Sequence, residues 1–366
     1  MKVAVLTGKR GGIDAMRPML QAMKEDSFFD LRIIACDQHL MGKFGGTGRD
    51  LSKDFHVRNV FPQSDGDDPL GRAINVAHYV EGIASALEYT TADLLMLYGD
   101  RGETVAGAIA ATQMNVPIAH LQGGDKTGTM DDIWRHTISK MARIHFVSCE
   151  QSRMRLQTQG ERNNVYVVGD SHIDPIRIWD CDEEGPPNIP SDYIILLLHP
   201  DSLEPKKARE QTYEAVQGAA IAARELSLGV ICIYPCSDPG HRGVLRVLEA
   251  ARTWENFQVF PNIPSRRFLP ILRDAYCIVG NSSCGIIEAP YVETPAVMVG
   301  DRQLGRAYSK ESTLFPDTNR FDIAEAIKHA EDKTTGWGMH YGDGYTGDRV
   351  IDILKTEGIP KGKSWA

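Results

Sequence analysis

Along this chain, short apolar runs alternate with longer stretches in which apolar residues recur every three or four positions. The short runs are typical of buried strands and the longer stretches of amphipathic helices. In the first half, the expected strands are Val3–Leu6, Leu31–Cys36, Leu94–Tyr98, Ile118–Leu121, Ile144–Ser148 and Val165–Val168. The expected helices are Ala15–Lys24, Pro69–Glu88, Val105–Met114, Asp132–Lys140 and Glu150–Gly160. This alternation predicts a parallel sheet with helices on both faces.

The alternation stops at residues 172–193, which are acidic and rich in proline and therefore predict a linker. It then restarts with expected strands at Tyr193–Leu198, Gly229–Tyr234, Gln258–Phe260, Tyr276–Val279 and Ala296–Val299. The expected helices are Lys206–Leu226, Arg242–Thr253, Arg266–Arg273 and Ser283–Ala289. We predict two doubly wound α/β domains, at residues 1–175 and 190–345. A last helix, Asp348–Glu357 within the tail 346–366, is expected to pack back on the first domain.

Length and composition agree with this organisation. A chain of 366 residues exceeds the usual size of one core, and 42% hydrophobic with 24% charged residues is typical of globular proteins. The net charge of −9 argues against a nucleic-acid partner. The apolar run in MKVAVLTGKR is too short for a signal or a membrane span, so we expect a cytoplasmic protein without a membrane partner. The seven cysteines lack zinc-ligand spacing and are expected to be structural.

Ligands of open parallel sheets bind at the carboxyl ends of the strands, and two such sheets predict a site in the cleft between domains. Arg10 lies in a Gly-rich loop after the first strand, where it can bind phosphate or remain a solvated side chain. His39 precedes a Gly-rich segment that could close over a substrate, but a loop histidine is more often solvated. Asp100 and Arg101 follow Leu94–Tyr98. Asp100 can cap the next helix, face the cleft, or do both.

The polar centre of the first domain is the string HLQGGDKTGTMDDIWRH, which begins at His120. Its two glycines allow a sharp turn and a close approach to a ligand. Asp131 and Arg135, like Asp132 and His136, are four apart and share a helix face. Such pairs are ordinary on a surface, but their place behind a glycine turn favours a functional role.

In the second domain, polar residues again follow the strands. His199 ends the first of them, and Asp238 follows the next. In VGNSSCGIIEAP, a strand runs into Ser282 and Ser283, which open a helix and can bind phosphates, and Glu288 can accept hydrogen bonds from ribose. Arg302 and Arg306 follow the last strand and suit diphosphate oxygens.

Taken together, these segments resemble the hydrolysing UDP-N-acetylglucosamine 2-epimerases of sialic acid and legionaminic acid synthesis. The resemblance runs from VAVLTGKR to about Arg306 and is most specific in YGDRGE, GGDKTGTMDDIWRH, GNSSCGIIEAP and GDRQLGR. It implies two Rossmann-like domains facing across a cleft, the glycosyltransferase B arrangement. It also implies a UDP-sugar substrate and no metal or other cofactor, and we expect a homo-oligomer, a dimer or a tetramer.

The resemblance also implies residue roles. Asp100 and Asp131 match acid–base positions, and Arg135 and His136 match a helix of the family. The residues expected to contact UDP are Arg10, Arg101, His199, Asp238, Ser282, Ser283, Glu288 and Arg302. The family eliminates UDP with loss of the C2 proton and then adds water to the glycal.

One departure concerns the base. Gln122 stands where the sialic-acid branch has a carboxylate, and an amide cannot accept the proton. Asp100 or Asp131 then supplies the base, or Asp125 takes over, or the substrate differs. Cys236 also replaces an asparagine that relatives often place beside the uracil.

Three alternatives remain open at this point. A non-hydrolysing 2-epimerase would return an epimeric UDP-sugar, although GNSSCGIIEAP and GDRQ favour the hydrolysing branch. A glycosyltransferase of the same fold would need an acceptor groove, and no aromatic-rich loop suggests one. A non-catalytic nucleotide-sugar-binding protein would keep the ligand site without a base, a hypothesis that Gln122 sustains.

Overall fold

The computed structural model describes residues 1–42, 46–66, 68–128, 130–179, 189–201, 203–332 and 337–361. Two compact units form, and each is described by itself. Unit 1 contains Met1–Lys126, Met130–Arg177 and Tyr341–Ala366, and unit 2 contains Ile178–His340 with the short stretch Thr127–Thr129. The chain thus leaves unit 1 after Arg177 and re-enters it at Tyr341.

Unit 1 is built on a seven-stranded parallel sheet with the order β3-β2-β1-β4-β5-β6-β7. Its strands are β1 (Lys2–Thr7), β2 (Asp30–Cys36), β3 (Val57–Val60), β4 (Leu94–Tyr98), β5 (Ile118–Leu121), β6 (Ile144–Val147) and β7 (Val165–Val167). Its helices are α1 (Arg10–Glu25), α2 (Gly48–Asp54), α3 (Pro69–Thr90), α4 (Gly102–Gln113), α5 (Asp131–Met141), α6 (Glu150–Thr158), α7 (Ile173–Ile178) and α13 (Thr346–Thr356). The strand order reverses beside β1, as in other doubly wound sheets.

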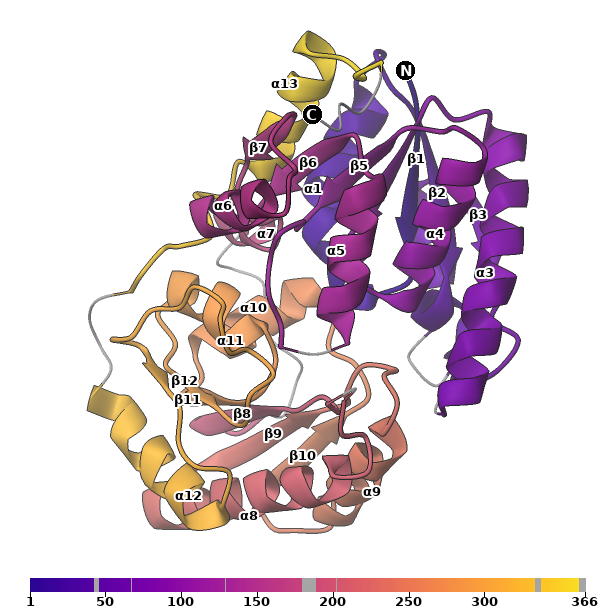
Figure 1. Cartoon of the computed structure of the whole chain (residues 1–366). Coiled ribbons are helices and arrows are strands. Elements are labelled where there is room, and N and C mark those ends of the chain that lie inside the picture. The colour runs from indigo at the N-terminus through magenta and orange to yellow at the C-terminus, as the bar shows by residue number, and fades with distance from the viewer. Residues whose placement is uncertain are drawn as a thin grey trace. The chain divides into compact units, whose positions relative to one another are not determined.

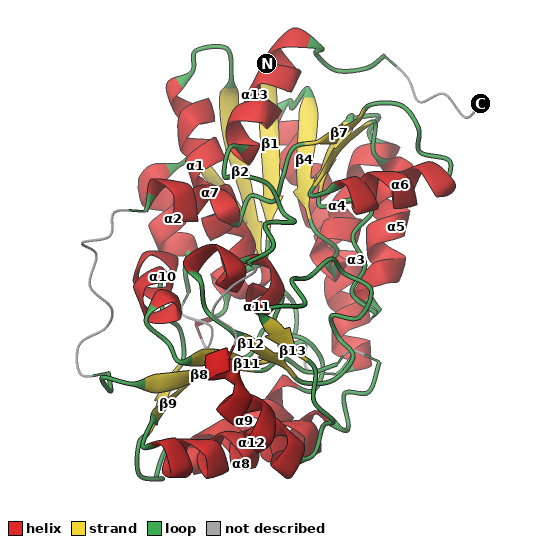
Figure 2. Ribbon diagram, turned by 90° about the vertical axis from the view of Figure 1, so that its left-hand side faces the viewer, coloured by secondary structure: helices red, strands yellow, loops and turns green. Residues whose placement is uncertain are grey.

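The alternation of side chains along each strand explains why helices cover both faces of this sheet. Val3 and Val5 of β1 point into a core formed with α1 and α13, which includes Met16 and Val350. Ala4 and Leu6 point the other way, into a core formed with α3, α4 and α5. Figures 1 and 2 show these two helical layers on either side of the strands.

Unit 2 contains a six-stranded parallel sheet with the order β10-β9-β8-β11-β12-β13. Its strands are β8 (Tyr193–Leu197), β9 (Gly229–Ile233), β10 (Phe257–Phe260), β11 (Cys277–Gly280), β12 (Ala296–Met298) and β13 (Thr313–Leu314). Its α-helices are α8 (Ala208–Leu226), α9 (His241–Ala251), α10 (Ser265–Arg273), α11 (Cys284–Ile287) and α12 (Arg320–Lys328). Helices α8, α9 and α12 bury one face of the sheet, and α10 and α11 lie on the other (Figure 1).

Residues 172–193 are only partly what the sequence predicted. The stretch was expected to be a linker, but its first part forms α7, in which Ile173 and Asp174 are buried. The Asp174 carboxylate accepts hydrogen bonds from the N–H groups of Thr346 (3.0 Å) and Gly347 (2.7 Å) at the start of α13. A carboxylate at a helix N-terminus satisfies free N–H groups and complements the helix dipole. This contact ties the last helix to unit 1.

No helix in the described part of the chain is long and apolar enough to cross a membrane. The six cysteines within the described ranges form no disulfide, and Cys181 lies outside those ranges. Burial raises the pKa of Cys232 to about 12. That thiol therefore stays protonated and packs as a small apolar group, in agreement with the structural role expected of the cysteines.

Candidate active site

Asp100 and Arg135 form the centre of a polar cluster at the carboxyl ends of the strands of unit 1. Asp100 follows β4, and Arg135 lies on α5 with only 1% of its side chain exposed. One guanidinium nitrogen of Arg135 binds the Asp100 carboxylate, and the other donates to the main-chain carbonyl of Gln122 (2.7 Å). In α4, which begins after this turn, Arg101 occupies the N-cap position. Asp100 is therefore not the N-cap residue, one of the roles that the sequence left open. Its carboxylate serves the ion pair instead.

A buried histidine supports the turn that carries Asp100. His120 Nε2 lies 2.7 Å from the carbonyl of Gly99, and its Nδ1 lies 3.0 Å from the Ser139 hydroxyl. Burial lowers the pKa of His120 to about 3, so the ring is neutral at pH 7. A carbonyl can only accept, so Nε2 carries the proton and donates to Gly99. His120 thereby fixes the peptide that precedes Asp100.

The glycine turn after β5 is sterically required. Gly124 has φ +77°, and a Cβ there would lie 2.3 Å from the main-chain oxygen of Ser152. Gln122 also has a left-handed backbone, with φ +62°. Such a conformation is uncommon for a residue with a side chain, and here the Arg135 bond to its carbonyl helps to hold it.

Gln122 links Asp100 and Arg135 to two residues that the sequence analysis did not select. Its amide donates to Asp170 Oδ2 (2.7 Å), and Asp170 Oδ1 lies 2.7 Å from His172 Nδ1. The same nitrogen lies 2.9 Å from the hydroxyl of Tyr98, the last residue of β4. The hydrogen bonds therefore run from Asp100 through Arg135, Gln122, Asp170 and His172 back to the end of β4. We call these five residues, together with Tyr98, the Asp100 cluster.

Asp170 is fully buried and charged. Burial alone would raise the pKa of this carboxyl, but the charge of His172 and hydrogen bonds from His172 and Gln122 outweigh burial and lower the pKa to about 2. Its main-chain N–H donates to the carbonyl of Tyr341 (2.8 Å), which fixes the turn. The signal was present in the sequence, because GDSH follows β7 just as GDR follows β4.

The other predicted acid–base residues lie apart from this chain of bonds. Asp125 is buried, and its Oδ1 accepts from the hydroxyls of Ser148 (2.6 Å) and Ser152 (2.5 Å). His136 contacts the side chain of Gln159 (3.2 Å) after α6. Asp131, partly exposed, is the first residue of α5, and its charge favours the protonated form of Arg135.

Arg101 lies in a second buried group of charges. Its Nε donates to Glu103 Oε1 (3.1 Å), and its Nη2 lies 3.5 Å from Asp37 Oδ2. Burial raises the pKa of Glu103, although Arg101 acts against this effect. These ion pairs orient the Arg101 guanidinium next to the first strand, where a Cβ at Gly8 would meet Glu103 at 2.5 Å.

Two predictions for unit 1 are wrong. Arg10 was expected in a loop but begins a helix, and His39 was expected to be solvated but is buried. Helix α1 begins at Arg10, which remains partly exposed. His39 is 1% exposed, with Nε2 2.9 Å from the Thr7 hydroxyl and Nδ1 2.7 Å from that of Thr47. Part of the segment expected to close over substrate, residues 43–45, lies outside the described residues.

Unit 2 has its own polar cluster at the carboxyl ends of its strands. His199 follows β8 and exchanges two hydrogen bonds with the side chain of Asn281 after β11 (2.7 and 2.8 Å). His199 Nδ1 accepts from the N–H of Cys236 (3.1 Å), and the Cys236 thiol lies 2.9 Å from Asp238 Oδ2. Arg302 Nη2 lies 3.8 Å from the same oxygen. We call these five residues the His199 cluster.

Three more predicted nucleotide contacts lie beside this cluster. Ser282 is buried, and its hydroxyl accepts a long hydrogen bond from the N–H of Cys284 (3.4 Å). Ser283 is the N-cap residue of the short helix α11, and Glu288 is its C-cap. Asn281 was missed, although it stands in the same GNSS string and its side chain joins β8 to β11.

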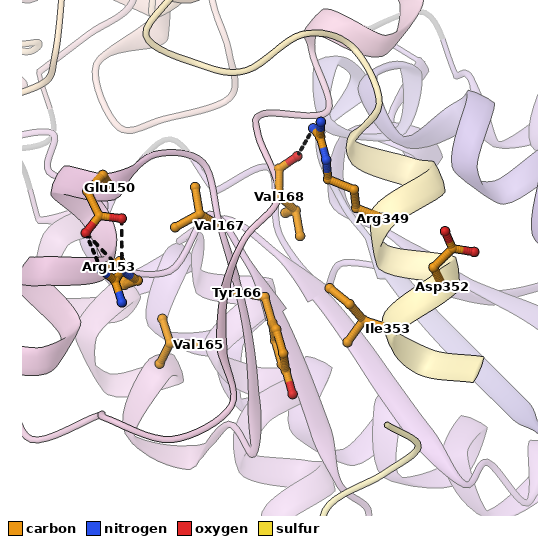
Figure 3. Close-up of a pocket in the computed structure, with 9 residues that line it drawn as sticks. All are labelled: Glu150, Arg153, Val165, Tyr166, Val167, Val168, Arg349, Asp352 and Ile353. Atoms are coloured by element: carbon orange, nitrogen blue, oxygen red, sulfur yellow. Dashed lines mark hydrogen bonds and ion pairs between the residues drawn. The ribbon is translucent and has the colours of Figure 1, made fainter. Parts of the chain in front are cut away.

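A groove of about 450 Å³ runs along the edge strand β7 of unit 1 (Figure 3). Val165 to Val168 form its floor, and residues of α6 and α13 form its sides. Arg349 closes one end by donating to the carbonyl of Val168 (3.1 Å). None of the nine residues drawn belongs to the Asp100 cluster, so this groove is separate from the candidate site.

The chain is similar to known proteins along most of its length. Residues 21–355 match the profile of a family described as UDP-N-acetylglucosamine 2-epimerase. The chain is 30% identical to a hydrolysing UDP-N,N'-diacetylbacillosamine 2-epimerase from Legionella pneumophila, over 97% of this chain and 96% of that one. It is 28% identical to a UDP-N-acetylglucosamine 2-epimerase from Neisseria meningitidis, over 90% and 87%.

Solved structures agree on the fold. The UDP-GlcNAc 2-epimerase of Methanocaldococcus jannaschii, in complex with UDP-GlcNAc and UDP, matches with a TM-score of 0.79 and 18% identity, over 97% of this chain and 99% of that one. This likeness confirms the predicted fold class. The family match and the Legionella relative confirm the resemblance seen in the motifs. The chain belongs to the UDP-N-acetylglucosamine 2-epimerase family.

Proposed function

We propose that this protein is a hydrolysing 2-epimerase. Its substrate is UDP-N-acetylglucosamine or a 6-deoxy diacetamido relative, and its products are UDP and the free manno-configured N-acetyl sugar. The name of the Legionella relative supports the hydrolysing reaction and the diacetamido sugar. The Neisseria relative supports UDP-N-acetylglucosamine.

The observation that carries the proposal is the ion pair of Asp100 with the buried Arg135. Inversion at C2 needs acid–base groups that are held in place, because the C2–H of a sugar is a weak acid. Arg135 makes two bonds at once, to the Asp100 carboxylate and to the Gln122 carbonyl, and so fixes the geometry around the carboxylate. Only 1% of the Arg135 side chain is exposed, whereas both partners of an ordinary surface ion pair are exposed to solvent.

The reaction proceeds in two halves. Loss of the C2 proton and of UDP gives a 2-acetamidoglucal, and water then adds to the double bond to give the C2 epimer. The second half needs a proton on the opposite face of C2, so at least two acid–base groups are required. We assign this work to groups of unit 1, with Asp100 and Asp131 among them and Arg135 as the residue that positions Asp100. Both halves are proton transfers and carbon–oxygen bond changes without a redox step.

The nucleotide is recognised by the groups of unit 2. His199, Asp238 and Arg302 are already joined through hydrogen bonds or charge contacts, and Ser282, Ser283 and Glu288 follow the neighbouring strand. Arg302 suits the growing negative charge of the departing diphosphate. Arg10 and Arg101 of unit 1 are further proposed contacts, and the ion pairs of Arg101 with Asp37 and Glu103 orient its guanidinium.

Product analysis tests the proposal. The protein is incubated with UDP-N-acetylglucosamine, and separately with UDP-N,N'-diacetylbacillosamine, and the nucleotides are separated by anion exchange. Release of UDP with an equal amount of free manno-configured sugar is expected for one of the two. An epimeric UDP-sugar without free sugar would identify the non-hydrolysing reaction, and UDP binding without turnover would identify a binding protein.

A further inference from the structure

We propose that His172, oriented by Asp170, is the base that takes the C2 hydrogen of the sugar ring. The inference rests on the proposed function and assigns one of its proton transfers. Gln122 cannot perform this step, because an amide has no basic atom at neutral pH. His172 is joined to Gln122 through Asp170, within the Asp100 cluster.

The turn between β7 and α7 places His172 at the same end of the sheet as Asp100. The main-chain N–H and the Nδ1 of His172 both lie within hydrogen-bond distance of Asp170 Oδ1, at 3.0 and 2.7 Å. Gly169 precedes this turn with φ +97°, and a Cβ there would lie 2.9 Å from the Thr346 hydroxyl. The turn is therefore closely packed and requires glycine, and a well-packed support helps to hold a catalytic side chain in place.

Exposure separates the two members of the pair. The Asp170 side chain is 0% exposed, whereas 12% of the His172 side chain is exposed. Solvent therefore reaches part of the His172 side chain but not the Asp170 carboxylate. Asp170 is the positioning residue, and His172 is the residue that meets the sugar.

The contacts also define which ring nitrogen is basic. The Asp170 carboxyl, whose pKa is lowered to about 2, stays ionised at neutral pH and only accepts hydrogen bonds. Nδ1 of His172 must therefore carry the proton in its 2.7 Å bond to Asp170. In the neutral ring the lone pair is then on Nε2, as in other Asp–His pairs in which the carboxylate fixes the tautomer.

Other groups face the imidazole from two elements. Tyr98 at the end of β4 places its hydroxyl 2.9 Å from Nδ1, and the rings lie 5.9 Å apart. Asp14 on α1 interacts electrostatically with Arg17, Arg10 and His172. Burial raises the pKa of the Asp14 carboxyl, and these three positive charges lower it in part. Asp14 thus adds a second carboxyl group near the imidazole, besides Asp170.

The proton transfer is balanced as follows. Nε2 takes the C2 proton, the C2–H electron pair becomes the C1=C2 bond, and the C1–O bond breaks with its electrons leaving on UDP. The Asp170 carboxylate balances the charge of the imidazolium. Water then bonds to C1 and gives up a proton, while Asp100 or Asp131 delivers a proton to the other face of C2. The imidazolium returns its proton to solvent.

The test separates the two halves of the reaction. UDP release, measured with UDP-N-acetylglucosamine and with UDP-N,N'-diacetylbacillosamine, requires elimination, whereas conversion of the corresponding glycal to the free manno-configured sugar in the presence of UDP requires only hydration. Both rates are measured for the wild-type protein and for the His172→Ala, His172→Gln and Asp170→Asn variants. Circular dichroism and UDP affinity check that each variant is folded, and the glutamine variant preserves side-chain volume if alanine disturbs the turn.

His172→Ala and His172→Gln are expected to lower UDP release by about 100-fold or more and to leave glycal hydration within about threefold of wild type. Added imidazole is expected to restore UDP release to His172→Ala. Asp170→Asn is expected to lower UDP release by about tenfold or more, because the tautomer is no longer fixed. Equal losses in both rates, or unchanged UDP release, overturn the inference. A wild-type protein that releases neither UDP nor sugar overturns the proposed function itself, and the inference with it.

Discussion

The buried guanidinium of Arg135 binds the carboxylate of Asp100 across the space between α5 and the end of β4. Asp100 follows a strand and Arg135 lies 35 residues later in the chain, so the pair exists only in the folded protein. Its partner carbonyl belongs to Gln122, the residue with the left-handed backbone. One side chain therefore fixes both strand-end turns of the candidate site.

Arg135→Lys should damage both stability and turnover. A lysine keeps the charge but cannot reach Asp100 and the Gln122 carbonyl with two directed bonds. We expect the free energy of unfolding to fall by about 2 kcal/mol, from the loss of one buried charge-assisted hydrogen bond. Formation of the free sugar should fall by about 100-fold, since the turn that carries Asp100 is no longer fixed. Urea unfolding and a free-sugar assay measure the two effects, and wild-type values for both would refute the role given to Arg135.

Asp100→Asn and Asp131→Asn should each abolish turnover while largely preserving UDP affinity. The amide retains the shape of the carboxylate but cannot exchange a proton, and general acid–base catalysis contributes about 100-fold to 10,000-fold. Asp352→Asn, an exposed position on α13, is the matched control and should behave as wild type. Rates of free-sugar formation and calorimetric UDP titrations provide the measurements. If both site variants kept near-normal rates, the acid–base assignment would be wrong.

Gly124→Ala should destabilise unit 1 strongly. The substitution combines a left-handed φ of +77° with a Cβ 2.3 Å from a main-chain oxygen, which cannot move aside as a side chain can. We expect a loss of about 3 kcal/mol. Gly11→Ala in α1 is the control, because its Cβ would have no heavy atom within 4 Å and should change stability by less than about 1 kcal/mol. Urea midpoints that fall equally for both variants would contradict this account.

The buried His39 should make stability depend on pH. Burial, with smaller effects of Arg10 and Arg17, lowers the pKa of His39 from 6.5 to about 4. Between these values the unfolded chain binds a proton that the folded protein does not, so stability is full above pH 6.5 and falls as the pH decreases. From pH 7.5 to pH 5.0 this one group should cost about 2 kcal/mol. His39→Asn should lose that part of the pH dependence in urea unfolding, and an unchanged dependence would argue against it.

Arg302→Ala should weaken nucleotide binding. Loss of a charge-assisted contact to phosphate is expected to raise the Kd for UDP by about 10-fold to 100-fold. Arg252→Ala is the control in the same unit, because Arg252 is an exposed residue of the α9 end that pairs with Glu249. Isothermal titration calorimetry compares them. Equal effects of the two substitutions would place the nucleotide elsewhere.

The main elements could be predicted from the sequence because their apolar runs are long and periodic. The strand β3 was not predicted, because only Val60 in VRNV is buried and the segment has no apolar run. The two-residue strand β13 is too short to show any period, and α12 has only three buried residues. Helix α7 was not predicted, because Pro175 and the acidic residues after it are typical of a linker. Asp174 in this helix binds the start of α13, 172 residues away in the chain, and no local pattern indicates such a contact.

Residues of the candidate site could be predicted where polar residues directly follow an expected strand. Asp100, Gln122 and Arg135 were selected in this way and are brought together by the fold. Pairings between distant segments were not predictable. The contact of Gln122 with Asp170 joins residues 48 apart, and no local pattern specifies which polar side chain the amide will find. Likewise, burial of Arg101 against Asp37 depends on the packing of β2 beside β1.

The measurement that tests the central claim most directly is proton NMR of the reaction in D2O with UDP-N-acetylglucosamine and with its diacetamido analogue. Removal and replacement of the C2 hydrogen predicts free manno-configured sugar that carries deuterium at C2, together with one equivalent of UDP. Free sugar that retains its original C2 hydrogen, or substrate that remains unchanged, would contradict the account.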